Sequence, residues 1–156
     1  MPLVRILVDG YSLLHNWPEL APGKPRHSAA ARDELIHWLT QYRDAIGTSI
    51  TIVFDGAGAP PGTPKPISTP ELEVLYSSGG HTADDVIERA ATRLGAYGEV
   101  LVVTDDFKER DTVLSFGGMA SSCLNFINDI ESALKEQQRE IANRNRRERQ
   151  KFKLPK

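Results

Sequence analysis

The sequence predicts an α/β fold in which helices cover both faces of a central, mostly parallel sheet. Short apolar runs alternate along the chain with longer amphipathic stretches, which is typical of strand–helix–strand units. The apolar runs are nearly unbroken, as expected of strands buried on both faces. The 156 residues are 40% hydrophobic and 26% charged, the balance of one globular domain with one sizeable core.

Four apolar runs are the expected strands. Residues 3–8 and 49–54 are the clearest, and each is followed by Asp-Gly. Residues 100–103 form a third strand, and residues 72–76 form a weaker candidate. Since each run is short and mostly apolar, we expect these strands to form the buried sheet.

Helical patterns fill the gaps between the strands. Ser28 can cap a helix that Gly47 ends. Thr82 and Asp85 have the spacing of a capping box, which predicts a second helix. A long amphipathic helix is expected from Ser121 onward, with its apolar positions at Leu124, Ile127, Ile130, Leu134 and Ile141.

Charge divides the chain into two parts, an expected domain at residues 1–134 and a basic helical tail at residues 135–156. The tail holds nine Lys or Arg and three Glu, whereas the rest holds 10 basic and 18 acidic residues. An acidic body argues against general polyanion binding, but a basic run is typical of segments that contact phosphates. The expected phosphate-binding residues are Arg144, Arg146, Arg147, Arg149 and Lys151 in the tail, with Arg89 and Lys108 in the body.

Secreted and membrane-bound classes are not expected for this chain. The first apolar run is interrupted by Arg5 and lacks the charge order and cleavage site of a signal peptide. The single Cys123 cannot form an internal disulfide or build a zinc site alone, so we expect a reducing, cytoplasmic compartment. The sequence has no Gly-rich phosphate loop with Lys-Ser/Thr, which disfavours a nucleotide cofactor.

Carboxylates follow three of the expected strands and begin one helix. Asp9 and Asp55 come directly after strands, and the pair Asp105-Asp106 follows a third strand after Thr104. Asp84 lies in the first turn of the helix after residue 82. The carboxyl ends of parallel strands share one edge of a sheet, where α/β proteins bind ligands. Each Asp taken singly is also an ordinary turn or first-turn residue. Their coincidence at one edge predicts a shared site.

Such a carboxylate cluster needs a compensating charge. Each pair repels by about 4 kcal/mol at an effective dielectric of about 20. No Lys or Arg lies close in sequence to Asp9, Asp55 or Asp84, which leaves protons or a bound cation. An all-oxygen ligand set suits Mg²⁺ or Mn²⁺ rather than zinc. Because such a cation activates water and neutralises a scissile phosphate, the pattern favours phosphodiester hydrolysis.

The acidic residues lie within motifs that resemble a known family. The motifs are Val8-Asp-Gly-Tyr-Ser-Leu-Leu-His15, Trp17-Pro-Glu-Leu20, Val53-Phe-Asp-Gly56, Tyr76-Ser77, Thr82-Ala-Asp84, Ile87-Glu-Arg89 and Val102-Val-Thr-Asp-Asp106. In this order and spacing, over about residues 3–135, the chain resembles the YacP-type NYN family of PIN-like ribonucleases. The resemblance implies a PIN-like three-layer sandwich and a metal-dependent endoribonuclease.

Site roles follow from this resemblance. It implies that Asp9 and Asp84 are the main ligands of Mg²⁺ or Mn²⁺, and that Asp106 and Asp55 bind the cation directly or through water. Ser12 stands where the family usually has Asn and is expected to orient the site as a polar group. Tyr11 is a candidate for stacking on bases of single-stranded RNA. The expected partner is RNA, with mRNA or ribosome-associated RNA as candidates.

Two other functions stay open at this point. A catalytically weak or inactive adaptor that binds RNA or ribosomes could keep the same fold. It is favoured by Ser12 and by Gly118-Met-Ala-Ser-Ser122, which lacks the Arg of the family's Gly-Ala-x-Arg-x-Ser segment. A receiver-like phosphoacceptor domain is suggested by the acidic strand ends with Thr104 and Lys108, although Asp9 lacks the acidic neighbour that such a site needs.

Overall fold

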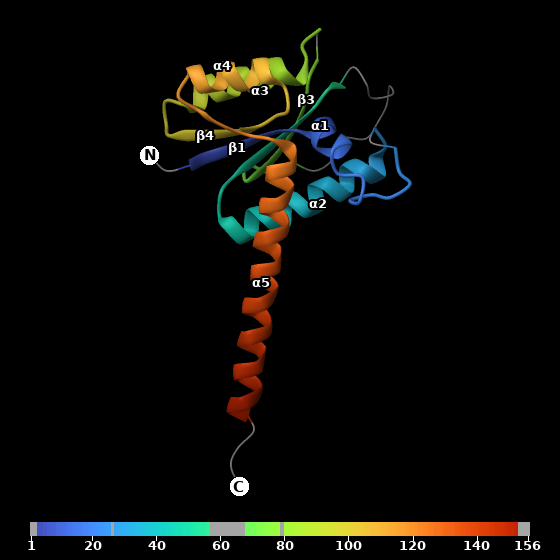
Figure 1. Ribbon diagram of the computed structural model, residues 1–156, viewed down its shortest axis with the longest axis vertical. Coiled ribbons are helices and arrows are strands. Elements are labelled where there is room, and N and C mark those ends of the chain that lie inside the picture. The colour runs from blue at the N-terminus through green and yellow to red at the C-terminus, as the bar shows by residue number, and fades with distance from the viewer. Residues whose placement is uncertain (1–2, 26, 57–67, 79, 153–156) are drawn as a thin grey trace.

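A five-stranded parallel sheet forms the centre of the computed structural model, which describes residues 3–25, 27–56, 68–78 and 80–152. The strands lie in the order β3-β2-β1-β4-β5 (Figure 1). Their bounds are β1 (Leu3–Asp9), β2 (Ile50–Phe54), β3 (Leu72–Tyr76), β4 (Glu99–Val103) and β5 (Met119–Ser121). The predicted α/β class and parallel sheet are confirmed, and the weaker strand candidate at residues 72–76 is β3.

Helices cover both faces of this sheet (Figure 1). On one face lie α1 (Gly10–His15), α2 (Ala29–Ile46) and the first part of α5 (Cys123–Phe152). On the other face lie α3 (Ala83–Leu94) and α4 (Phe107–Ser115). The result is the three-layer sandwich that the alternation of strands and helices predicts.

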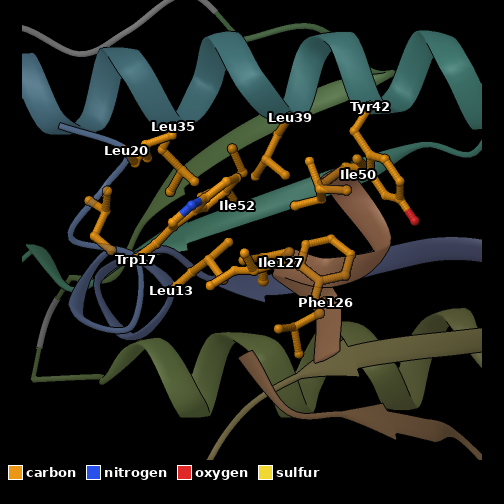
Figure 2. Packing of buried hydrophobic residues seen from close by; sticks show 14 of the residues in the cluster. Leu13, Trp17, Leu20, Leu35, Leu39, Tyr42, Ile50, Ile52, Phe126 and Ile127 are labelled. Atoms are coloured by element: carbon orange, nitrogen blue, oxygen red, sulfur yellow. The ribbon is translucent and has the colours of Figure 1, made fainter. Parts of the chain in front are cut away.

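The larger core fills the space between the sheet and α2 (Figure 2). Leu35 and Leu39 of α2 are 0% exposed and pack toward the sheet. Phe126 of α5 closes this cluster, with its ring edge-on to Tyr42 at a centroid distance of 5.5 Å. Full burial of each such side chain contributes about 1.5–3 kcal/mol to stability.

Successive residues of β1 serve opposite faces of the sheet. Ile6 and Val8 belong to the core beneath α2, whereas Leu7 packs with Ile87 of α3 on the other face. A strand buried on both sides cannot alternate apolar with polar residues, which explains the nearly unbroken apolar run.

The predicted helix ends are also confirmed. The Ser28 hydroxyl accepts a hydrogen bond from the backbone N–H of Ala31 at 3.2 Å, and Gly47 ends α2 with φ of 74°. Thr82 and Asp85 form the reciprocal capping box at the start of α3, with distances of 3.1 and 3.2 Å. These signals act within a few residues, so tertiary packing does not alter them.

The sequence pattern misses the shorter elements and misplaces part of α5. The elements α1, α4 and β5 are too short for periodicity to reveal. In α5, Leu124 is 61% exposed and Ile141 is 49% exposed, whereas Phe126 is buried in place of Leu124. The expected apolar stripe is therefore wrong at its two ends and right at its centre.

The second half of α5 projects away from the layers (Figure 1). Leu134 is the last buried residue of this helix, and residues 138–152 are all exposed. The expected boundary after residue 134 therefore falls inside one continuous helix. Across the described ranges, the length and apolar character needed to cross a membrane are not combined in any helix.

A candidate active site at the carboxyl ends of β1 and β4

The strand order reverses at β1, since β2 and β3 lie on one side of it and β4 and β5 on the other. In open α/β sheets, this reversal opens a crevice beyond the carboxyl ends of the strands. Here the crevice is an open cavity of about 550 Å³. Its lining is Asp9, Tyr11, Ser12, His15, Asn16, His27, Asp55, Thr82, Ala83, Asp84 and Asp105.

Asp9 ends β1 and caps α1, with its Oδ1 accepting a hydrogen bond from the backbone N–H of Ser12 at 3.2 Å. The following Gly10 lets α1 start close to the sheet, because a Cβ there would lie 2.3 Å from Cε1 of Phe54. Burial raises the pKa of Asp9 above its usual value, Ser12 opposes this rise, and the charges of Asp84 and Asp55 add to it. Three carboxyl groups that sequence analysis grouped together thus interact in the folded protein.

Asp55 follows β2 and is fixed by Ser77 at the end of the neighbouring strand. The Ser77 hydroxyl donates to Oδ1 of Asp55 at 3.2 Å and accepts from the backbone N–H of Gly56 at 3.0 Å. Ser77 is 4% exposed, so this bridge is shielded from water. The Tyr76-Ser77 motif therefore has a positioning role that its sequence does not reveal.

The neighbouring residues Asp84 and Asp85 divide two tasks at the start of α3. Asp85 accepts a hydrogen bond from the backbone N–H of Thr82, and this bond lowers the pKa of Asp85. Asp84 instead lines the cavity. Within the first turn of α3, Asp85 therefore caps the helix, whereas Asp84 faces the cavity.

The pair Asp105-Asp106 is divided in the opposite order to the one expected. Asp106 caps α4, with its Oδ1 accepting from the backbone N–H of Lys108 at 2.9 Å, and it lies outside the cavity lining. Asp105 lines the cavity and accepts from the backbone N–H of Cys123 at 2.9 Å. Because α4 begins directly after Asp106, that carboxylate is used by the helix, and the structure does not bring it to the predicted cluster.

Glu109 is a buried acidic neighbour of Asp84 and Asp9 that sequence analysis missed. It is 2% exposed, and its Oε2 accepts a hydrogen bond from the Thr104 hydroxyl at 3.1 Å. Burial, together with the neighbouring Asp84 and then Asp9, raises the pKa of Glu109 to about 9, although Thr104 opposes the shift. Its Oε1 is buried without a partner at hydrogen-bonding geometry among the described residues. The sequence would have indicated that the Glu109 side chain points inward only if the first residue of α4 had been known.

Tyr11 lines the cavity but is only 7% exposed. Its ring packs against His27 and Phe54, with centroid distances of 4.3 and 5.0 Å. Its hydroxyl accepts a hydrogen bond from Nη1 of Arg32 at 3.4 Å. This packing leaves little of the ring for base stacking, and Ser12, which also lines the cavity, is more accessible.

The predicted basic residues lie apart from the cavity. Arg89 is exposed on α3, where its Nη2 lies 3.2 Å from Nδ1 of His81, and Lys108 is exposed on α4. The described lining of the cavity contains neither Lys nor Arg. The five tail residues are exposed on the projecting part of α5. The structure therefore separates the acidic site from the basic surface.

A hard cation fits the donor chemistry of this site. Among the described residues, no three His, Cys, Asp or Glu side chains converge as a ready-made metal centre. Mg²⁺, however, is usually bound by one or two carboxylates, with waters and substrate phosphates completing the octahedron. The bare buried oxygen of Glu109 and the mutual repulsion at Asp9 are what such a cation would relieve.

Comparison with known proteins agrees with these features. The family model described as YacP-like NYN domain matches residues 6–155. The uncharacterized protein YacP of Bacillus subtilis is 28% identical over 137 residues, which cover 87% of this chain and 80% of that protein. The crystal structure of Rae1 (YacP) from the same organism matches with a TM-score of 0.78 and 26% identity, covering 95% of this chain and 84% of the other.

The crystal structure of the W164L mutant of Rae1 is similar as well, with a TM-score of 0.76 and 25% identity over 90% of this chain and 83% of that one. Homology to Bacillus subtilis YacP/Rae1 confirms the resemblance drawn from the motifs. It also leaves the receiver-like alternative without support. Since the family match spans nearly the whole chain, the protein belongs to the YacP-like NYN domain family, which has the PIN-like fold.

Proposed function

We propose that this protein is a metal-dependent endoribonuclease that hydrolyses RNA phosphodiester bonds. The presence of Asp9, Asp55 and Asp84 in the lining of one open cavity carries the proposal. The charges of Asp84 and Asp55 also help to raise the pKa of Asp9. Proteins with the NYN and PIN-like fold are typically nucleases, and the family match adds that support.

Asp9 and Asp84 would hold Mg²⁺ or Mn²⁺, with Asp55 and Asp105 acting directly or through water. Glu109 lies outside the described cavity lining and would act through the neighbouring Asp84 and Asp9. We assign to Asp105 the role that the sequence predicted for Asp106, since only Asp105 lines the cavity. A divalent cation supplies an activated water and neutralises charge on the phosphate when it is bound.

Other groups of the chain hold these carboxylates in place. The backbone N–H of Ser12 fixes Asp9, and the Ser77 hydroxyl fixes Asp55. The Thr104 hydroxyl does the same for Glu109. Since these donors are part of the folded chain, they fix the direction of each carboxylate before a cation arrives.

RNA binding requires a second region, because an acidic cavity repels phosphates. The basic half of α5 supplies the attraction, with Arg144, Arg146, Arg147, Arg149 and Lys151 as the contacting residues and Arg89 and Lys108 as candidates on the body. Single-stranded RNA suits an open cavity, since a flexible strand can enter it. Messenger RNA or ribosome-associated RNA is the expected source.

An RNA- or ribosome-binding adaptor without cleavage is the second candidate. The exposed basic helix favours it, since this surface stands apart from the acidic cavity and needs no chemistry there. The two functions share RNA binding and differ in what the carboxylates do.

One experiment separates the two functions. Purified protein is incubated with a mixed RNA pool in Mn²⁺, beside an EDTA control and the Asp9→Asn variant. We expect cleavage by the parent alone, with RNA binding retained by Asp9→Asn. Binding without cleavage in all samples would establish the adaptor, and equal cleavage by Asp9→Asn would identify a contaminating nuclease.

A further inference from the structure

A second, smaller cavity adjoins the acidic one and is not used by the mechanism proposed above. It has a volume of about 330 Å³ and lies where the start of α4, the end of β5 and the start of α5 meet. Asp105 lines both cavities, so they share a wall. A strand that places a phosphate at the acidic site can therefore place its neighbouring nucleotide here.

Phe107 gives this cavity an exposed aromatic wall. Its side chain is 69% exposed, which is unusual for Phe, even though the guanidinium carbon of Arg110 lies 4.7 Å from the ring centroid. A single exposed aromatic residue is ordinary on a protein surface. Phe107 differs because it borders a cavity that shares Asp105 with the candidate catalytic site, where an aromatic ring provides a stacking surface for a base.

Arg110 adds a cation beside this ring. Its side chain is 47% exposed, and its ion pair with Asp111 is a long one, with Nη2 lying 3.7 Å from Oδ1. Unlike Arg89 and Lys108, Arg110 belongs to the described lining of this second cavity. A guanidinium group in this position can contact a phosphate oxygen while remaining stacked on Phe107.

The two carboxylates of the cavity do not cancel this attraction. Asp105 accepts from the backbone N–H of Cys123 at the start of α5, and Asp106 accepts from that of Lys108 at the start of α4. Each lies at the positive end of a helix, which offsets part of its charge. Arg110 projects into the same space with a full positive charge.

We propose that Phe107 and Arg110 form a subsite for the nucleotide next to the scissile phosphate, with Phe107 stacking on the base and Arg110 contacting the phosphate. The inference rests on the proposed function and adds a specificity element to it. Because stacking accepts every base, the subsite selects unpaired RNA over paired RNA rather than one sequence.

The test compares Phe107→Ala and Arg110→Gln with matched controls, Leu114→Ala on the same helix and Arg93→Gln on α3. Leu114 is 52% exposed and Arg93 is exposed, and neither lines the second cavity. Binding is measured by fluorescence anisotropy in EDTA with a six-nucleotide RNA and with versions carrying one abasic position each. Thermal melts confirm that the variants fold.

We expect Phe107→Ala to weaken binding of the complete RNA by about tenfold and to bind one abasic version as the parent does. Phe107→Tyr should restore parental binding, because it keeps the ring. Arg110→Gln should lower the slope of log affinity against log salt by about one unit, as expected for the loss of one phosphate contact. The two controls should match the parent.

Equal losses for every abasic version, or losses no larger than those of the controls, would overturn the subsite. The fate of the proposed function is read separately, from cleavage of the mixed RNA by the parent in Mn²⁺. If the parent cleaves RNA but Phe107→Ala and Arg110→Gln bind RNA as the controls do, the proposed function stands and the subsite is refuted. If the parent binds RNA but does not cleave it, the proposed nuclease function is refuted. The abasic series then still decides whether Phe107 stacks on a base. A parent that does neither overturns both.

Discussion

The acidic cavity and the projecting half of α5 carry opposite charges in opposite surroundings. At the cavity, Asp9 is half-buried, and its neighbour Glu109 is fully buried. Donors of the chain hold both carboxyl groups, and burial raises their pKa values. On α5, residues 138–152 are all exposed, and the ion pairs there are long, such as the 3.9 Å between Lys151 Nζ and Glu148 Oε1.

Charge therefore has two uses in this chain. Shielded carboxylates interact strongly at short range, which suits the binding of a cation and chemistry at one bond. Exposed bases interact weakly with each other and are screened by salt, but together they attract a polyanion. Substitutions in the acidic cavity should therefore abolish RNA cleavage without affecting RNA binding, and removal of the basic half of α5 should weaken RNA binding without affecting the cleavage chemistry.

Removal of an acidic ligand should have the largest effect. Asp9→Asn and Asp84→Asn should each reduce metal-dependent RNA cleavage to background, while the metal-free melting temperature stays equal or rises because like-charge repulsion is relieved. Cleavage rates and thermal melts measure the two effects. Asp85→Asn is the matched control, since it should keep cleavage and lower the melting temperature through loss of the α3 cap.

Unfolding of both variants, or cleavage at the parental rate, would make these carboxylates structural and remove the contrast between the two regions.

Truncation after Glu140 should have the next largest effect. It should weaken RNA binding but leave the cleavage step unchanged. The slope of log affinity against log salt should fall by several units as phosphate contacts are lost. Cleavage at saturating RNA should persist, because the residues beyond Leu134 leave the core intact. Binding is measured across a salt series. An unchanged slope would show that the basic half of α5 is only a solvated helix end.

The Glu109 carboxyl predicts a pH dependence of stability. Its pKa is about 9 in the folded protein and about 4.3 in an unfolded chain, so the folded state binds one more proton between these values. The metal-free protein should therefore lose stability as the pH rises through this window, by at most about 1.4 kcal/mol per unit for one proton. Urea unfolding at several pH values measures this slope.

Glu109→Gln should flatten the pH dependence, because Gln has no proton to lose. The same slope in the variant would assign the dependence to other groups.

Ser12 should give the smallest effect, since it acts through Asp9. An Asn side chain has both a donor and an acceptor and reaches farther than a hydroxyl. Ser12→Asn should raise cation affinity or cleavage rate, and Ser12→Ala should lower it by about tenfold. Calorimetric titration with Mn²⁺ and cleavage rates test both. Identical behaviour of the two variants would show that Ser12 only shapes the start of α1.

The fold was predictable where the signals are local and strong. Apolar runs identify the four longer strands, and Ser28 and Thr82 identify helix starts, because each depends on neighbouring residues. The candidate site was predictable only in part. Whether Asp105 or Asp106 faces the cavity depends on where α4 begins, and a shift of one residue exchanges them.

Other features of the site depend on residues distant in sequence. Tyr11 packs against Phe54 and accepts a hydrogen bond from Arg32, which lies 21 residues further along the chain. Glu109 belongs to a nine-residue helix in which only it and Val113 are buried, too few positions to give a period. Contacts between segments that are distant in sequence produce no local pattern from which a single sequence would predict them.

The backbone N–H that holds Asp105 belongs to Cys123, the first residue of the same helix that ends in the basic surface. An α-helix rises about 1.5 Å per residue, so the tail bases lie about 30–40 Å along the helix from the cavity wall. A rigid spacer of this length sets a minimum size for the ligand that touches both regions. An oligonucleotide of a few residues reaches only one of them, whereas a long RNA can span the two. The helix thereby selects for the length of the RNA, independently of its base sequence.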